Sequence, residues 1–272
     1  MAQFTGNFSQ KVVTRSVTLI PWACLVVVFT LFSSPGVSGL PETLTLVKPG
    51  VVAVGTSQKT RRPPSKFLGT GFVVGDGHYI VTNAHVISEL LAVEELEHLA
   101  IFAGRGRRPE MRRAEQVAMD LVHDLAILKI AGDPLPPLRL GKSEGVREGQ
   151  SIAFTGFPIG TILGLFPVTH RGIVSTITPI ALPSQSSRQL STKLIKRLRA
   201  PFDVFQLDAT AYPGNSGSPV YDQKTGKVLG VLNMVFVKET KEEVLEKPSG
   251  ISYAIPVEYV RLLLKSALNK TD

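Results

Sequence analysis

The chain has 272 residues, of which 43% are hydrophobic and 19% are charged. This composition is typical of a globular protein and excludes an intrinsically disordered one. The net charge of +8 comes from short runs of Lys and Arg, which would suit acidic proteins, anionic lipid or nucleic acid. We interpret them as solvated loops and expect no nucleic-acid partner.

Residues 17–32 are apolar, follow Lys11 and Arg15, and precede the small, turn-forming residues 33–39. A basic start, an apolar stretch and a small-residue exit are the regions of a signal peptide, here with cleavage expected after Gly39. The run is shorter than the ~18 apolar residues of a membrane span. An uncleaved anchor at residues 17–32, which would keep the protein at the inner membrane, is the alternative. Either way, the remaining chain is expected in the periplasm or outside the cell.

Cys24, the single cysteine, lies inside this apolar run. The exported part therefore has no cysteine for a disulfide, a catalytic thiolate or a zinc site. The apolar run continues beyond Cys24, which excludes a lipoprotein signal at that position.

From about Leu44 onward, short apolar stretches alternate with Gly, Pro and charged residues. Short strands at this spacing, with few helical stretches, predict an all-β protein, either a barrel or a sandwich. The expected strands cover residues 51–54, 71–74, 79–81, 100–103, 126–130, 151–155, 172–177, 204–207, 228–233 and 251–254.

Two stretches have helical periodicity. Residues 88–99 carry an incomplete apolar stripe, and residues 256–268 begin with proline and repeat apolar residues at helical spacing. We expect a short helix at each. The polar and basic residues 183–201 are expected to form an inserted loop whose role the sequence does not specify.

Three motifs carry candidate chemistry: His85 follows an apolar stretch, Asp124 opens another, and Ser216 lies between two glycines. A serine hydroxyl needs a base within hydrogen-bond reach, and an imidazole, which titrates near neutrality, can act as that base. A carboxylate then orients the imidazole and stabilises its charged form. The order His, Asp, Ser predicts Ser216 as nucleophile, His85 as general base and acid, and Asp124 as the orienting carboxylate. His123, beside Asp124, is expected to face solvent.

The turn that holds the serine, Gly214-Asn215-Ser216, is a candidate oxyanion hole. Its glycines permit the dihedral angles of a tight turn. The N–H groups of Gly214 and Ser216 are expected to converge where the oxygen of a tetrahedral intermediate becomes negative.

Beyond these motifs, the chain resembles the trypsin-like serine proteases of the bacterial HtrA/DegP type. The similarity runs from about Leu44 to Leu268 and includes residues 69–74 (GTGFVV), 156–160 (GFPIG) and 250–256 (GISYAIP). It implies two six-stranded antiparallel β-barrels, at about 44–140 and 148–255, followed by the helix at 256–268, within a protease domain of residues 40–272. It also implies peptide-bond cleavage in polypeptides through an acyl-enzyme, without a metal or a cofactor, and by analogy a homotrimer.

The chain also departs from this family. It ends after the terminal helix, so no PDZ domain is expected. In the trypsin-like arrangement, the floor of the primary pocket lies six residues before the serine, at Thr210, and the opposite wall at Asn233, Met234 and Val235. These uncharged residues predict a preference for small or medium apolar side chains.

Two alternatives stay open at this point. The first is a latent or inactive protein with a protease fold that binds or regulates, because the oxyanion loop can rest in a collapsed form. The second is an esterase or transferase with the same three residues, which the order of the motifs disfavours.

Overall fold

The fold is described from a computed structural model that covers residues 1, 3, 39–88, 96–104, 106, 109–158, 164–180, 201–233 and 251–269. Most of the expected signal segment, including residues 17–32, and most of the expected loop at 183–201 lie outside these ranges. Within them, no helix is both long and apolar enough to span a bilayer. The part from Gly39 onward belongs to one compact unit.

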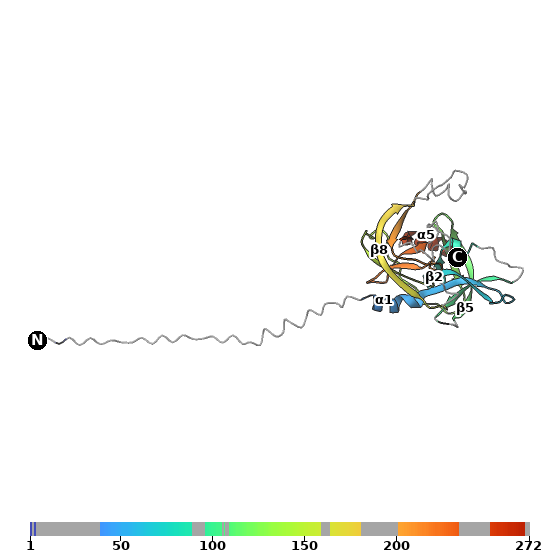
Figure 1. Cartoon of the computed structure of the whole chain (residues 1–272), viewed down its shortest axis with the longest axis horizontal. Helices are drawn as coiled ribbons and strands as arrows, with labels where there is room; N and C mark the ends of the chain where they lie inside the picture. The colour runs from blue at the N-terminus through green and yellow to red at the C-terminus, as the bar shows by residue number, and fades with distance from the viewer. Residues whose placement is uncertain are drawn as a thin grey trace. The chain divides into compact units, whose positions relative to one another are not determined.

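The first half of this unit is a closed antiparallel barrel with the strand order β1-β2-β3-β6-β5-β4. Its strands β2 and β5 are labelled in Figure 1. It follows a short helix, α1 (Leu40–Val47), and a 3₁₀ turn at Lys48–Gly50. The strands are Val51–Ser57 (β1), Ser65–Val74 (β2), Tyr79–Thr82 (β3), His98–Ala103 (β4), Glu110–Asp120 (β5) and Leu125–Ile130 (β6). The helix expected at residues 88–99 is wrong at its end, because His98 and Leu99 pair with β1 as part of β4.

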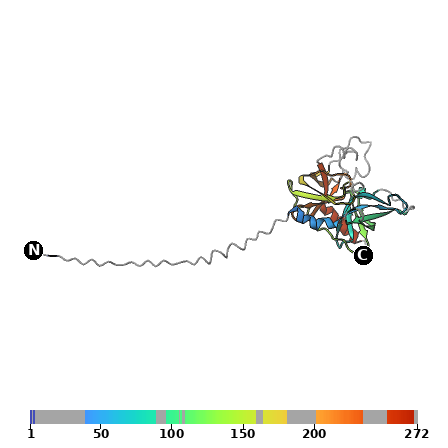
Figure 2. The same ribbon diagram turned by 60° about the horizontal axis from the view of Figure 1, so that its bottom comes forward.

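The second half is another closed barrel, with the order β10-β11-β12-β9-β8-β7. Its strands are Ser151–Gly156 (β7), Val168–Pro179 (β8), Asp203–Asp208 (β9), Pro219–Asp222 (β10), Val228–Asn233 (β11) and Ile251–Pro256 (β12). The chain continues directly into helix α5, Val257–Leu268, which is red in Figure 2. The prediction of two six-stranded barrels and a terminal helix is confirmed.

The continuous apolar runs of the first barrel follow from burial on both faces. In β1, Val52 and Val54 point into the barrel, whereas Val51 and Ala53 join a second core that the two barrels share. Successive side chains of a strand alternate between faces, so a strand buried on both faces needs apolar residues at every position.

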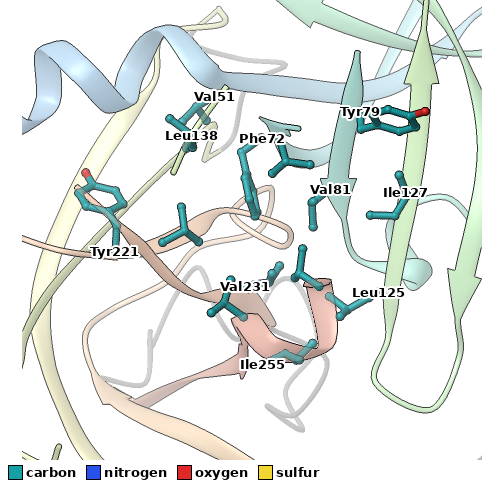
Figure 3. Close-up of a cluster of buried hydrophobic side chains, with 14 of the residues drawn as sticks. Val51, Phe72, Tyr79, Val81, Leu125, Ile127, Leu138, Tyr221, Val231 and Ile255 are labelled. Carbon is teal, nitrogen blue, oxygen red and sulfur yellow. The ribbon is translucent and has the colours of Figure 1, made fainter. Parts of the chain in front are cut away.

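The shared core joins both barrels and the terminal helix (Figure 3). Phe72, Val81 and Leu125 reach it from the first barrel, and Val231 and Ile255 from the second. Helix α5 adds Val257 and Val260. The end of β3 lies beside the start of β6, where Thr82 pairs with Ala126, and Asn233 at the end of β11 contacts Asp124 just before β6. These strand ends carry the candidate site.

Candidate active site

His85 lies in a short 3₁₀ turn, Ala84–Val86, immediately after β3. The turn is tied to the start of β6, since the Ala84 N–H donates to the carbonyl oxygen of Asp124 at 3.1 Å. The buried amide of Asn83 donates to the same carbonyl oxygen at 3.0 Å. These two bonds bring His85 and Asp124, which are 39 positions apart in sequence, into one site.

Asp124 holds the His85 ring with its carboxylate. His85 Nδ1 lies 2.7 Å from Asp124 Oδ2, and the backbone N–H of His85 donates to Oδ1 at 3.0 Å. The Asp124 carboxylate is buried, whereas the imidazole is partly exposed. Because an ionised carboxylate only accepts hydrogen bonds, Nδ1 carries the hydrogen, and Nε2 is left to accept one.

Asn233 contributes a third bond to this carboxylate. Its amide Nδ2 donates to Asp124 Oδ2 at 2.8 Å across the junction of the two barrels. Sequence reasoning assigned Asn233 to a pocket wall, but the structure buries its side chain completely and directs the amide to Asp124. A polar residue at the end of the apolar strand β11 was the one signal in the sequence for this contact.

The turn with Ser216 is fastened to β2 of the first barrel. The Thr70 N–H donates to the carbonyl oxygen of Ser216 at 2.9 Å, and Thr70 Oγ1 donates to the carbonyl oxygen of Gly214 at 2.7 Å. Gly217 has a φ of +87°, and a Cβ there would lie 2.0 Å from the Thr70 carbonyl oxygen, so only glycine fits.

Gly69 shows that the serine turn adjoins the histidine turn. A Cβ on Gly69 would lie 2.9 Å from the side chain of Val86 and 3.1 Å from the carbonyl oxygen of Ser216. The turns of His85 and Ser216 therefore meet at the same glycine of β2.

The backbone N–H groups of the expected oxyanion hole differ in whether they donate a hydrogen bond within the protein. The N–H of Asn215 donates to the carbonyl oxygen of Tyr212 at 3.0 Å and is thus used within the turn. The N–H groups of Gly214 and Ser216 have no acceptor among the residues that the structure describes. The Asn215 side chain is completely buried, and its amide atoms have no partner within the same part of the chain.

Of the other expected pocket residues, Thr210 is half-buried just after β9. Met234 and Val235 lie outside the described residues. Sequence reasoning also missed His170 on β8, whose ring centroid lies 4.9 Å from that of Phe154, on which it stacks, and 5.8 Å from that of Tyr212. Burial lowers the pKa of His170, because charging the ring would cost solvation.

Among the described residues, no group of three or more His, Cys, Asp or Glu side chains is placed to hold a metal ion. The described site residues themselves offer a serine hydroxyl, an imidazole oriented by a carboxylate, and backbone N–H donors.

Comparison with known proteins gives consistent matches. The family model described as a trypsin-like peptidase domain matches residues 69–231. A probable periplasmic serine endoprotease DegP-like of Halomonas elongata is 32% identical over 191 residues, covering 70% of this chain and 33% of the relative. The serine protease HTRA2, mitochondrial, of Drosophila willistoni is 30% identical over 209 residues, covering 77% and 40%. The chain thus spans a third to two fifths of the length of these relatives.

Solved structures give the same fold. The HtrA-type protease AlgW with tripeptide has a TM-score of 0.61 at 24% sequence identity, covering 86% of this chain and 64% of its own. The serine endoprotease from Yersinia pestis has a TM-score of 0.59 at 22% identity, covering 85% and 67%.

Proposed function

The chain belongs to the trypsin-like peptidase family, and from this premise we propose that it is a serine endopeptidase that cleaves polypeptides through an acyl-enzyme on Ser216. The observation that carries the proposal is the 2.7 Å contact between His85 and the buried Asp124, beside the turn that holds Ser216. A histidine held in one tautomer by a buried carboxylate is what an attacking serine requires.

In this proposal, Nε2 of His85 removes the proton of the Ser216 hydroxyl as its oxygen attacks the peptide carbonyl. Asp124 stabilises the resulting imidazolium, which then gives the proton to the leaving amine. Water next attacks the acyl-enzyme, again with His85 as base, and releases the second product. Each step thus uses the same histidine with its Nδ1 hydrogen held by Asp124.

The tetrahedral intermediates need donors for their negative oxygen. The N–H groups of Gly214 and Ser216, which have no acceptor in the described part of the chain, support this role. Losing one such donor typically costs about 2.7–4 kcal/mol of transition-state stabilisation. Asn215 belongs to this turn through its backbone but keeps its own N–H on Tyr212.

For substrates, we infer unfolded polypeptides with small or medium apolar side chains at the primary position. Thr210 is half-buried and uncharged, which disfavours Lys or Arg in that pocket. Cleavage of a peptide library dominated by Lys or Arg at this position would contradict the inference.

Export is proposed from the basic and apolar N-terminal residues, and relatives such as the one from Halomonas elongata are named as periplasmic. A homotrimer and an anchor at residues 17–32 are finer proposals. The mass of the purified assembly in solution tests the first, and fractionation of cells tests the second.

Casein cleavage by the full chain tests the proposed function, with Ser216→Ala as the inactive variant. Ser218→Ala is a matched control, because Ser218 is completely buried and its hydroxyl has no partner among the described residues. We expect cleavage by the wild type and the Ser218 variant and none by the Ser216 variant. A folded wild type without activity would instead support the latent binding protein.

A further inference from the structure

His123, the residue before Asp124, forms a second histidine–carboxylate pair with Asp120. His123 Nδ1 is 2.5 Å from Asp120 Oδ2, and both side chains are about three quarters buried. Neither residue contacts the Ser216 turn in the described structure, so the proposed reaction does not use them directly.

Asp120 closes the turn that leads to Asp124. Its Oδ1 accepts the backbone N–H groups of Val122 at 2.9 Å and His123 at 3.1 Å. Burial works to raise the pKa of Asp120, but the hydrogen bonds and the charge of His123 outweigh it, and the pKa falls below its ordinary value. The Asp120 carboxylate is therefore ionised and fastened to its own turn.

The His123 ring fastens this turn to other elements, contrary to the expectation that it faces solvent. It stacks on Tyr259 of helix α5, with ring centroids 3.9 Å apart and planes 19° apart. It also meets the edge of Phe202, just before β9, at 4.5 Å. The single ring thus connects the first barrel with the terminal helix and with the residue that precedes β9 of the second barrel.

The contacts of His123 matter for the site because the next residue, Asp124, has an unusual backbone conformation. Its φ is +56°, a left-handed conformation that costs a non-glycine residue about 1–2 kcal/mol. Such a conformation persists only where neighbouring contacts hold it. Since the φ of Asp124 sets where its carboxylate points, contacts that hold the preceding residue also direct the carboxylate toward His85.

We propose that His123 is a positioning residue, which together with Asp120 and Tyr259 holds the turn that presents the Asp124 carboxylate to His85. The inference rests on the proposed function, because the site that it positions is the one assigned there. His123 does not touch the substrate. It acts through the geometry of the bond between His85 and Asp124.

Proton NMR of the full chain tests this directly. A hydrogen held between an imidazole nitrogen and a carboxylate resonates far downfield, and the resonance of His85 is the one lost in His85→Ala. We expect His123→Ala to shift or broaden that resonance and to lower kcat about tenfold, the equivalent of about 1.4 kcal/mol, with KM changed less than twofold.

Two further variants separate positioning from stability. His123→Asn keeps a donor near the position of Nδ1 for Asp120 and should recover part of the lost kcat. His78→Ala is the matched control: His78 also pairs with a carboxylate, that of Asp76 at 3.2 Å, but lies at the opposite end of β6, where its carbonyl oxygen accepts the Ile130 N–H. It should change neither the resonance nor kcat.

The outcomes distinguish the two proposals. An unchanged His85 resonance and unchanged kcat in folded His123→Ala overturn the positioning role, even if its melting temperature falls. A wild type that cleaves nothing, but whose His85 resonance responds to His123→Ala, overturns the proposed function and supports the positioning role. If His123→Ala does not fold, Tyr259→Leu, which keeps apolar volume but loses the stacking, is judged by the same two readouts.

Discussion

Both carboxylate oxygens and the carbonyl oxygen of Asp124 accept hydrogen bonds, although the residue is completely buried. A buried charge is costly unless such bonds compensate it. The carboxylate is bound by His85 and Asn233 and the carbonyl oxygen by Asn83 and Ala84, so residues of both barrels support Asp124. At the scale of single residues, the candidate site is therefore organised around the fixed carboxylate of Asp124, and His85 is one of its hydrogen-bond partners.

Asn233→Ala removes one donor from this carboxylate. A hydrogen bond to a charged group contributes about 1.5–3 kcal/mol, so we expect kcat/KM to fall about tenfold or more. Asn233→Ser, which keeps a hydroxyl donor, should recover part of the loss. Steady-state kinetics check this, and an Asn233→Ala enzyme with wild-type kcat/KM would show that the amide does not support Asp124.

His170 gives a prediction about pH. Its pKa is lower in the folded chain than in the unfolded one, so the unfolded state binds more protons as the pH falls below about 6.5. The folded chain should therefore lose stability from that pH downward, until the pH passes the lowered pKa. His170→Phe keeps an aromatic ring against Phe154 and has no proton to bind.

Urea unfolding between pH 7 and 5 checks this prediction. The free energy of unfolding should fall less with acid in His170→Phe than in the wild type. Equal slopes for the two proteins would contradict it.

The order of the motifs led to the expectation that His85, Asp124 and Ser216 act together, and the structure shows a contact between His85 and Asp124 beside the turn of Ser216. The sequence did not predict the contacts of Asn233, His123 and His170. Each of these is a single polar residue with a contact to an element far away in the chain: Asp124 for Asn233, Tyr259 for His123, in addition to the nearby Asp120, and Tyr212 for His170. Such pairs leave no pattern in one sequence.

At the scale of elements, helix α5 fastens the segment between the barrels. Glu258 accepts the N–H of Ser143 at 3.0 Å, and its own N–H donates to Ser143 Oγ at 3.3 Å. Arg261 donates to the carbonyl oxygens of Leu140 and Gly141. The helix thus holds the barrels together by polar bonds as well as through the shared core.

Arg261→Ala should lower the melting temperature by about 2–4 °C, because losing about 1 kcal/mol has this effect in a protein of this size. Lys265→Ala, an exposed basic residue on the same helix, is the control and should leave it unchanged. Thermal unfolding followed by circular dichroism measures both. Equal melting temperatures for the two variants would mean that the bonds of Arg261 do not contribute.

Ten strands were predicted from apolar stretches, and two were missed for different reasons. β5 has the sequence EMRRAEQVAMD, in which only Ala114 and Ala118 are buried. It therefore shows no apolar pattern from which a strand could be predicted. β10 has four residues and follows the serine turn directly. The predicted helix at 88–99 is wrong at its end because His98 and Leu99 pair with β1 and are therefore in a strand.

At the scale of the whole molecule, the candidate site exists only where the two barrels meet. His85 and Asp124 belong to the first barrel, whereas Ser216 and Asn233 belong to the second. The close approach of Gly217 to Thr70 joins the two halves at the serine turn. The resemblance to known proteases predicted this arrangement, which strand periodicity alone could not distinguish from a sandwich.

The most direct test of the account is a fluorophosphonate probe, which forms a covalent bond with an activated serine. We expect peptide mass spectrometry of the labelled full chain to find a single adduct, on Ser216, and none in Ser216→Ala or His85→Ala. An adduct on another residue, or a folded wild type that does not react, would contradict the assignment of Ser216 as an activated nucleophile.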